Sequence, residues 1–235
     1  MAKPLTDGIN ALTRYANSVT GASDATLSEA VATLANGYGG GSKHYSLPTE
    51  YQEVEYLVMT QNCYFNLGMR AYFNIGYSVD FLLYGRYNQF GPHLISTNTN
   101  YCWFIPRESD TMVKFYNTET QFPVSQLNTR YVVKVNHDGN GKYISGDTER
   151  TLPSKGNAVN AQYFEICPYA SGTGNSGYHM NGELHHVTLY NNGVLVEDFV
   201  PCYRKSDNVA GLYDIVNGIF YTNGGNGTIT VGADV

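Results

Sequence analysis

The stretch LHHVTLYNNGVLVEDFV, residues 184–200, contains the pattern that decides the fold. Apolar and polar residues mix at the short period of a β-strand on both sides of Asn191-Asn192-Gly193. Asn and Gly accept the positive φ angles that tight hairpin turns require. The stretch therefore predicts two antiparallel strands joined by a short turn.

Two more segments of the chain have the same pattern. Residues 130–135 alternate, turn at His137-Asp138-Gly139-Asn140-Gly141, and continue into residues 142–144. Residues 215–216 turn at Asn217-Gly218 into residues 219–221. Further strand-like segments lie at 54–59, 63–67, 78–84, 101–105, 112–116, 163–167 and 228–231. About a dozen short strands at even spacing predict a mainly β fold, an antiparallel β-sandwich or jelly roll.

The first 42 residues differ from the rest of the chain. They contain two aromatic residues, Tyr15 and Tyr38, and the run from Gly37 to Ser42 is rich in glycine. We therefore expect three parts: a helical anchor or oligomerisation segment at 1–36, a linker at 37–44, and a jelly roll at 45–235.

Helical spacing in the first segment predicts two short helices. Their apolar stripes consist of Leu5, Ile9, Leu12 and Val19, and of Leu27, Val31 and Leu34. Two short helices are marginal in water, so these stripes need a partner. They could pack on the body of the same chain. We favour docking into a larger assembly or self-association, with a trimer as the preferred homo-oligomer.

Composition and charge exclude several classes of protein. Charged residues make up 14% of the chain, and the net charge is −6. No cluster of five to eight basic residues occurs, which argues against nucleic-acid binding. No apolar run approaches the ~18 residues of a membrane span, and no secretion signal is recognisable, so we expect synthesis in a cytosol without membrane insertion. The four cysteines, Cys63, Cys102, Cys167 and Cys202, are expected to be reduced and semi-buried, although two disulfides in any of three pairings are also possible.

Both ends of the predicted β domain resemble a known group of proteins. LPTEYQEVEYL (47–57), DFVPCYRKSD (198–207), GLYD (211–214) and FYTN (220–223) are similar to the opening and ending of concanavalin-A-like, laminin-G-like jelly-roll domains found in tailed bacteriophages and prophages. The similarity covers about 45–235 and is strongest at both ends. Residues 9–41 resemble the N-terminal segments of phage tail and baseplate proteins. The resemblance implies a virion protein, made in the host cytoplasm, that contacts other virion proteins through residues 1–36.

The sequence gives little support to catalysis. Related glucanases have a Glu-x-Asp-x-x-Glu strand, which is absent here, and no Gly-x-Ser-x-Gly elbow occurs. Glu53 and Glu55 are two apart on a predicted strand and so share a face, but catalysis by this pair is disfavoured. Asp147 with Glu149, and Glu197 with Asp198, are interpreted as solvated hairpin charges. We expect that the protein is not an enzyme.

Metal binding is also disfavoured, and no cofactor is expected. Residues 137–141 offer oxygen ligands that could hold Ca²⁺, but a hairpin turn explains the same residues. His185 and His186 are adjacent, so on a regular strand they point to opposite faces, one to the surface and one to the core.

Ligand binding is the strongest functional hypothesis. The loop from Tyr169 to His179 is rich in Gly, Ser and Asn and flanked by aromatic residues, which suits either a binding loop at the sandwich rim or a functionless connection. Tyr and Trp stack on sugars and contact proteins, while a single Trp in an apolar run also suits a core. The candidate ligand-binding residues are Trp103, Tyr169, Asn175, Tyr178 and His179.

These observations predict a tail or fibre adhesin that binds a bacterial surface carbohydrate. The alternatives are a capsid or tail decoration protein, similar to a head fibre, with no specific ligand, and less favoured, a glycoside hydrolase. The fold hosts all three functions, so the fold alone does not choose between them.

Overall fold

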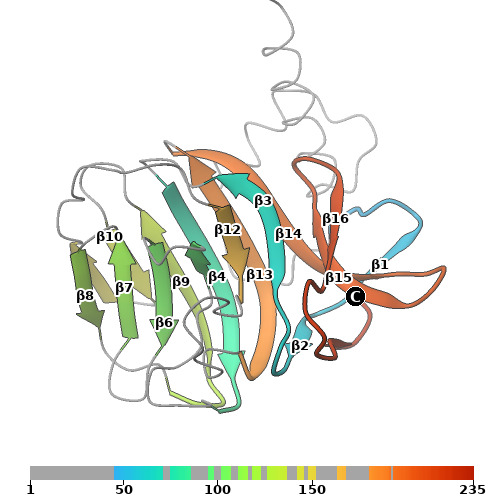
Figure 1. The fold of residues 1–235 in the computed structure, drawn as a ribbon, viewed down its shortest axis with the longest axis horizontal. Helices are drawn as coiled ribbons and strands as arrows, with labels where there is room; N and C mark the ends of the chain where they lie inside the picture. Colours follow the sequence, from blue (N-terminus) through green and yellow to red (C-terminus); the bar gives the residue numbers. More distant parts are fainter. Residues whose placement is uncertain are drawn as a thin grey trace, which may run out of the picture.

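The computed structural model describes twelve ranges of the chain, and every regular element within them is a β-strand (Figure 1). The ranges are 45–70, 75–85, 95–97, 102–106, 111–115, 118–122, 126–136, 142–145, 148–151, 163–167, 180–191 and 193–235. The predicted helices within 1–36 and the linker at 37–44 lie outside the described residues, so they remain predictions.

Eleven of the described strands form the larger of two sheets. Their order is β11-β10-β9-β4-β13-β14-β15-β16, while β1 pairs with β14, and β2 pairs with both β13 and β17. All these pairings are antiparallel. The strands are β1 (Tyr51–Glu53), β2 (Leu57–Met59), β4 (Ile75–Leu83), β9 (Arg130–Asn136), β10 (Lys142–Ser145), β11 (Thr148–Thr151), β13 (Gly182–Asn191), β14 (Val194–Arg204), β15 (Val209–Asp214), β16 (Ile219–Thr222) and β17 (Thr230–Val231).

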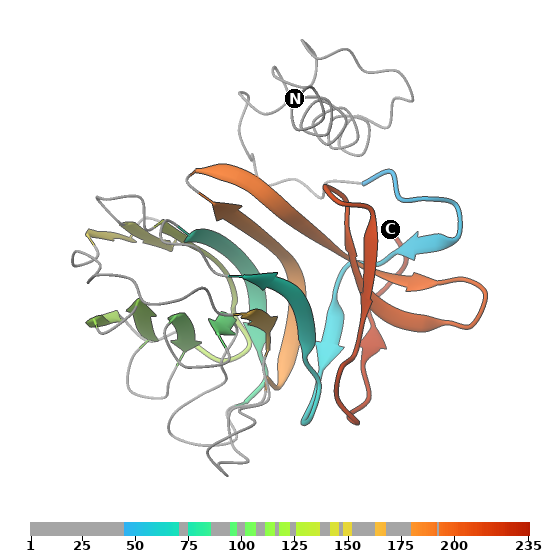
Figure 2. The same cartoon turned by 45° about the horizontal axis from the view of Figure 1, so that its top comes forward.

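Six further strands form the smaller sheet, which lies against one face of the larger sheet (Figure 2). In spatial order they are β3 (Phe65–Arg70), β12 (Tyr163–Ile166), β5 (Ile95–Thr97), β6 (Cys102–Pro106), β7 (Thr111–Phe115) and β8 (Thr118–Phe122). The prediction of a mainly β, antiparallel sandwich is confirmed.

The hairpins predicted from turn residues are present. Strands β9 and β10 pair directly, as do β13 with β14 and β15 with β16. Gly193 and Gly218 have φ angles of 74° and 71°, which residues with a side chain adopt only with strain. The third hairpin differs in one respect: Ile215 and Val216 lie in the turn after β15, not in a strand.

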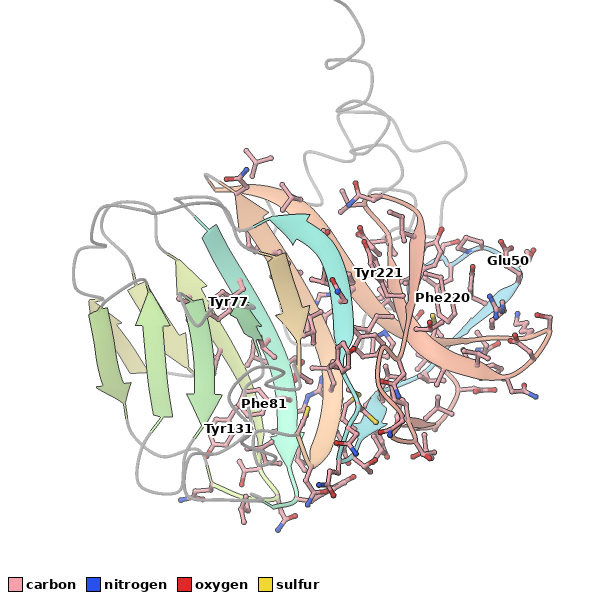
Figure 3. All side chains as sticks on the ribbon, viewed as in Figure 1. Glu50, Tyr77, Phe81, Tyr131, Phe220 and Tyr221 are labelled. Carbon is pink, nitrogen blue, oxygen red and sulfur yellow. The ribbon has the colours of Figure 1, made fainter. Side chains whose placement is uncertain are left out.

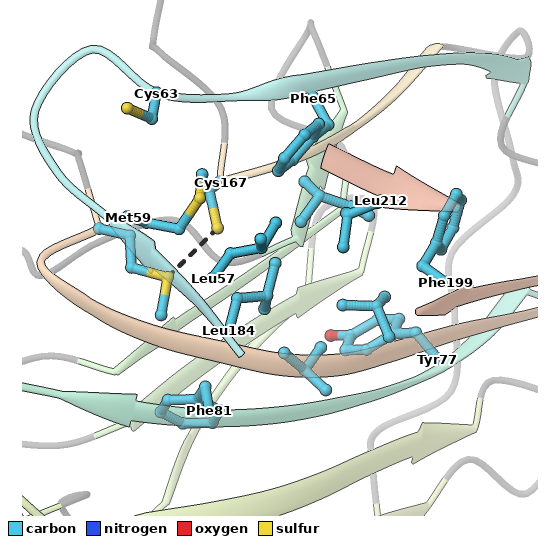
Figure 4. Packing of buried hydrophobic residues seen from close by; sticks show 14 of the residues in the cluster. Leu57, Met59, Cys63, Phe65, Tyr77, Phe81, Cys167, Leu184, Phe199 and Leu212 are labelled. Atoms are coloured by element: carbon cyan, nitrogen blue, oxygen red, sulfur yellow. Dashed lines mark hydrogen bonds between the residues drawn. The ribbon is translucent and has the colours of Figure 1, made fainter. Parts of the chain in front are cut away.

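The core lies between the sheets and is built by alternation along each strand. On β4, Tyr77, Val79, Phe81 and Leu83 are buried against the smaller sheet, while the residues between them face away. Figure 4 shows Phe65 of the smaller sheet packed among side chains of the larger one. Each fully buried side chain of this size contributes about 1.5–3 kcal/mol.

The cysteines agree with the expectation of free thiols where they can be described. Cys63, Cys167 and Cys202 are unpaired and buried, while the side chain of Cys102 lies outside the described part. The Cys167 thiol lies 3.4 Å from the sulfur of Met180. Burial raises the pKa of the Cys202 thiol to about 12, so this thiol stays protonated and behaves as a small apolar group.

Two distant parts of the chain meet at Glu53. Its carboxylate Oε2 accepts a hydrogen bond from the backbone N–H of Tyr45 (2.7 Å), and its backbone carbonyl accepts one from Val235 (3.2 Å). The neighbouring Val54 forms a β-bridge with Asp234. The first and last described residues therefore lie at the same end of β1.

Removal of the Phe81 side chain tests the core. Phe81 is fully buried, and its ring centroid lies 6.2 Å from that of Tyr131 (Figure 3). We expect Phe81→Ala to lower the free energy of unfolding by about 3–5 kcal/mol in urea titrations, because it leaves a cavity. Val132→Ala is the control, since Val132 is 44% exposed, and a change of about 0.5 kcal/mol is expected. An equal loss of unfolding free energy in both variants would contradict the burial of Phe81 in the core.

Candidate functional site

An extra residue in β13 reorganises the outer face of the larger sheet, the face turned away from the smaller sheet. Leu184 pairs with Phe81 and His186 with Asp80, so His185 is left over and forms a β-bulge. His185 bonds to Glu183, and His186 lies on the side of Asp80, so both rings face outward. The expectation of one outward and one core-facing histidine is wrong, because the bulge interrupts the alternation.

The bulge brings together six side chains, which we call the outer-face cluster: Tyr56, Asp80, Tyr84, Arg130, Glu183 and His185. The Tyr84 hydroxyl donates to Oε1 of Glu183, and His185 Nε2 lies 2.9 Å from Oε2 of the same carboxylate. Each oxygen of Glu183 thus has one neighbour, His185 from the same strand and Tyr84 from outside it. The sheet supplies Glu183 and His185, and the segment after β4 supplies Tyr84.

Arg130 and Asp80 form the charged pair of this cluster. Arg130 Nε and Nη2 each donate to one oxygen of Asp80, both at 2.8 Å, in the bidentate geometry that favours Arg over Lys. The Arg130 side chain is 56% exposed, while that of Asp80 is 15% exposed. The hydrogen bond to Asp80 is the main cause that raises the pKa of Arg130. Solvent therefore reaches the guanidinium from one side.

Aromatic rings border the cluster. The Tyr56 ring centroid lies 5.1 Å from that of His185. Gly232 leaves room for this ring, since a Cβ on Gly232 would come within 2.9 Å of Tyr56 Cε1. Tyr84 is 41% exposed, and Val132 on the neighbouring strand is also exposed. The cluster thus combines an accessible aromatic face with donors and acceptors of hydrogen bonds.

The protonation states in the cluster follow from burial and neighbours. Burial, followed by the charge of Arg130, lowers the pKa of His185 despite the opposing carboxylates of Asp80 and Glu183. His185 is therefore neutral at neutral pH. The hydrogen bond to Glu183 raises the pKa of Tyr84 to about 12, so the phenol keeps its proton and donates.

A second group of polar side chains, the Tyr45 cluster, lies nearby on the same face and consists of Tyr45, Glu53, His186 and Asp198. His186 Nε2 lies 2.5 Å from Asp198 Oδ1 and 3.1 Å from the Tyr45 hydroxyl. The Tyr45 ring stacks on His186 at 5.5 Å between centroids. Burial raises the pKa of Glu53 to about 7. Tyr45 covers this cluster, which makes it a structural contact and not an open site.

Two acidic residues interpreted from the sequence as solvated are buried. Asp198 is inaccessible to solvent and Glu197 is 5% exposed. The backbone N–H of Asp198 donates to Asp214 Oδ1 (3.0 Å), which ties β14 to the end of β15. Burial, and then the charge of Asp214, raises the pKa of Glu197 to about 8. The interpretation failed because neighbouring β15 and its turn cover this part of β14.

The motifs that resemble phage jelly rolls fix turns and chain ends. Arg204 forms an ion pair with Asp207 across the β14–β15 turn (2.6 Å). Asp214 accepts bonds from the backbone N–H of Val216 and from the Asn217 side chain. Asn223 accepts from the backbone of Tyr64 and donates to that of Gly227. These residues stabilise the fold, whereas Tyr56 of the opening motif belongs to the outer-face cluster.

Most of the predicted ligand-binding residues cannot be placed. Tyr169, Asn175, Tyr178 and His179 lie outside the described residues. Trp103 lies in β6, and the position of its ring is not described. The predicted anchor contacts also lie outside the described part; they are Leu5, Ile9, Leu12, Val19, Leu27, Val31 and Leu34.

Glu53 and Glu55 occupy different surroundings. Strand β1 ends at Glu53, which bonds to the backbone of Tyr45, whereas Glu55 lies exposed in a bend and influences Arg130 electrostatically. The expectation that both lie on one strand and share its face is wrong, because the strand ends between them.

Sequence reasoning missed the outer-face cluster. Its members come from four separate segments, and only the His185-His186 pair drew attention to one of them. Alternation did place Asp80 and Arg130 on strands. The bulge that gathers them leaves no signal in a single sequence.

The described part of the chain has neither a cluster of metal-ligating side chains nor a membrane-spanning helix. No group of three or more His, Cys, Asp or Glu side chains within the described ranges could hold a metal ion. No helix in that part of the chain is long and apolar enough to span a membrane.

Comparison with known proteins finds similarity of fold to solved structures, but no matching sequence family. No family model and no curated protein matches the chain. Among solved structures, a Bacteroides ovatus protein described as carbohydrate-binding is similar with a TM-score of 0.56 and 12% identity. The match covers 78% of this chain and 62% of that one, so this chain spans less than two thirds of its length.

Two weaker likenesses are a heptameric SAP-like pentraxin from Limulus polyphemus and an alginate lyase of polysaccharide lyase family 7. The pentraxin has a TM-score of 0.49 and 11% identity over 77% of this chain and 95% of that one. The lyase has a TM-score of 0.33 and 13% identity over 65% of each. The fold is a jelly-roll sandwich of the concanavalin-A-like type, as expected from the sequence.

The buried carboxyl of Glu197 predicts a dependence of stability on pH. Its pKa is raised in the folded state, so its favourable contribution is present at low pH and is lost as the pH rises towards about 8. Between pH 7 and pH 9 we expect the free energy of unfolding to fall by about 1 kcal/mol more in the unmodified protein than in Glu197→Gln. Urea titrations at both pH values measure the difference. If the free energy of unfolding depended on pH in the same way in both proteins, the raised pKa of Glu197 would be refuted.

Proposed function

We propose that this protein is a bacteriophage virion protein, a tail or fibre adhesin whose jelly roll binds a carbohydrate on the bacterial surface. The outer-face cluster is the observation that carries the proposal. It joins an exposed tyrosine to a carboxylate, a neutral imidazole and a half-exposed guanidinium on one rigid sheet. Sites on sheets hold such groups in fixed positions, which lowers the entropic cost of binding.

The chemistry of the cluster matches the surface of a sugar. The apolar C–H face of a pyranose stacks on an aromatic ring, here that of Tyr84. Sugar hydroxyls both donate and accept hydrogen bonds, so they pair with the free lone pairs of Glu183 and with the exposed guanidinium edge of Arg130. Neither contact changes a covalent bond, so the proposed mechanism is reversible binding without catalysis.

Two independent likenesses support the proposal. The fold is shared with a Bacteroides ovatus protein described as carbohydrate-binding. The sequence at both ends of the jelly roll, and that of residues 9–41, resembles proteins of phage particles. On a particle, many copies compensate for the weak affinity of a single sugar site.

A binding experiment tests this function. The full chain is titrated against polysaccharides purified from bacterial cell walls and against intact cells, while released sugar is measured in parallel. We expect binding without release. Tyr84→Ala is expected to weaken binding by about tenfold, since truncating a contacting aromatic side chain costs more than ~1 kcal/mol.

Tyr203→Phe provides a matched control for the variant Tyr84→Phe. Both remove a tyrosine hydroxyl that bonds to a carboxylate, Glu183 for Tyr84 and Asp234 for Tyr203, but Tyr203 lies outside the cluster. Only Tyr84→Phe is expected to weaken binding. Release of sugar would favour a hydrolase, and lack of binding to every polymer and cell type would favour a decoration protein.

The proposed anchor has a separate test. In the adhesin, residues 1–36 dock onto other virion proteins and associate with copies of themselves, with a trimer preferred. We expect the double variant Ile9→Asp, Leu12→Asp to have a lower mass in light scattering than the unmodified chain, because charges on an apolar stripe oppose its burial. The same mass for both proteins would contradict self-association through this stripe.

A further inference from the structure

We propose that the outer-face cluster selects glycans that carry a free, protonated amino group and rejects anionic glycans. This inference rests on the proposed function, since it names the class of sugar that the same surface takes. It follows from the charges of the cluster and from their burial.

The first step concerns the Arg130–Asp80 pair. Its two hydrogen bonds bring one positive and one negative charge together at 2.8 Å, so the pair contributes little net charge to the surface. A glycan carboxylate that bound Arg130 would have to compete with Asp80, which already holds the guanidinium in bidentate geometry. The only basic residue among the six of the cluster is therefore a poor receptor for an anion.

The second step concerns Glu183. Its side chain is 13% exposed, and its two hydrogen-bonding neighbours, the Tyr84 hydroxyl and His185, are uncharged at neutral pH. Arg130 acts on this carboxylate only at longer range, because its guanidinium is bound to Asp80, and among the described residues no permanently charged cation bonds to Glu183. An ammonium group of the ligand supplies such a direct partner to a largely buried carboxylate.

Among the described residues around the cluster, another carboxylate adds to its negative potential. Glu55 is exposed and, like Glu183, lies close enough to raise the pKa of Arg130. Lys134 is the next basic residue along β9, four residues or about 13 Å from Arg130. That distance exceeds the screening length of ~8 Å at physiological salt, so Lys134 does not offset the carboxylates. The net charge of the whole chain, −6, has the same sign.

An amino sugar can contact Tyr84 and Glu183 at the same time. Its ring stacks on Tyr84, which is the exposed aromatic group, while its ammonium donates to Glu183 directly beside that ring. A hydrogen bond between two charged groups is roughly twice as strong as one between neutral groups. An N-acetylated sugar keeps the stacking contact but lacks the charge, and a uronic acid introduces repulsion.

Titration calorimetry with the full chain tests the inference at pH 7 and physiological salt, the conditions for which the charges above are argued. The probes are tetrasaccharides of glucosamine, of N-acetylglucosamine and of galacturonic acid. We expect the glucosamine probe to bind at least tenfold more tightly than the N-acetylated one, and the galacturonic acid probe not to bind. Glu183→Gln is expected to remove the preference. Glu50→Gln, which removes an exposed charge at β1, is the matched control and is expected to keep it.

Each other outcome overturns the inference. Tighter binding of the N-acetylated or the acidic probe would show that the cluster selects another class of sugar, while binding of cell-wall polysaccharide would still support the proposed function. If the preference for glucosamine persists in Glu183→Gln, or is lost equally in Glu50→Gln, the preference arises from the net negative charge of the protein and not from the cluster. Failure of all three probes, together with failure of every polysaccharide and cell type, would refute both proposals.

Discussion

Strand β13 is bonded along both edges and packed on its inner face, and the rest of the structure depends on this constraint. Strands β4 and β14 flank it, and Val187 and Leu189 are fully buried beneath it. A slip of one residue along β4 would move every buried side chain to the outer face. The extra residue at His185 is therefore absorbed locally as a bulge, which concentrates polar side chains at one point of the sheet.

The sequence predicted the parts of the fold that depend on local chemistry. Asn-Gly turns and alternating residues identified the hairpins at Gly193 and Gly218, because positive φ angles and period two are local properties. The burial of Glu197 and Asp198 was not predictable in this way, since it depends on β15 folding back over β14. The same holds for the cluster around Glu183, whose neighbours are up to about a hundred residues away in the chain.

Tyr56 is the one residue shared between the motifs that resemble phage proteins and the outer-face cluster, whose other five members lie outside those motifs. Arg204 holds a turn through its ion pair with Asp207, and Asp214 and Asn223 bond to backbone groups, so these residues specify a shape. Glu183, Tyr84 and Arg130 bond to other side chains at a surface. A substitution in the second set changes what the surface presents without disturbing those turns. The same scaffold is thus compatible with different ligands.

The meeting of Tyr45 and Val235 at Glu53 has a consequence for how this body can be carried. Because Glu53 bonds to both Tyr45 and Val235, these two ends of the described β body lie at a single place on the sandwich. A body with adjoining ends can be inserted into a surface loop of another protein without stretching that loop. The same closeness permits circular permutation, with a short peptide joining residue 235 to residue 45 and new ends opened at the β13–β14 turn. The jelly roll is in this sense a module whose place in a longer chain is free to change.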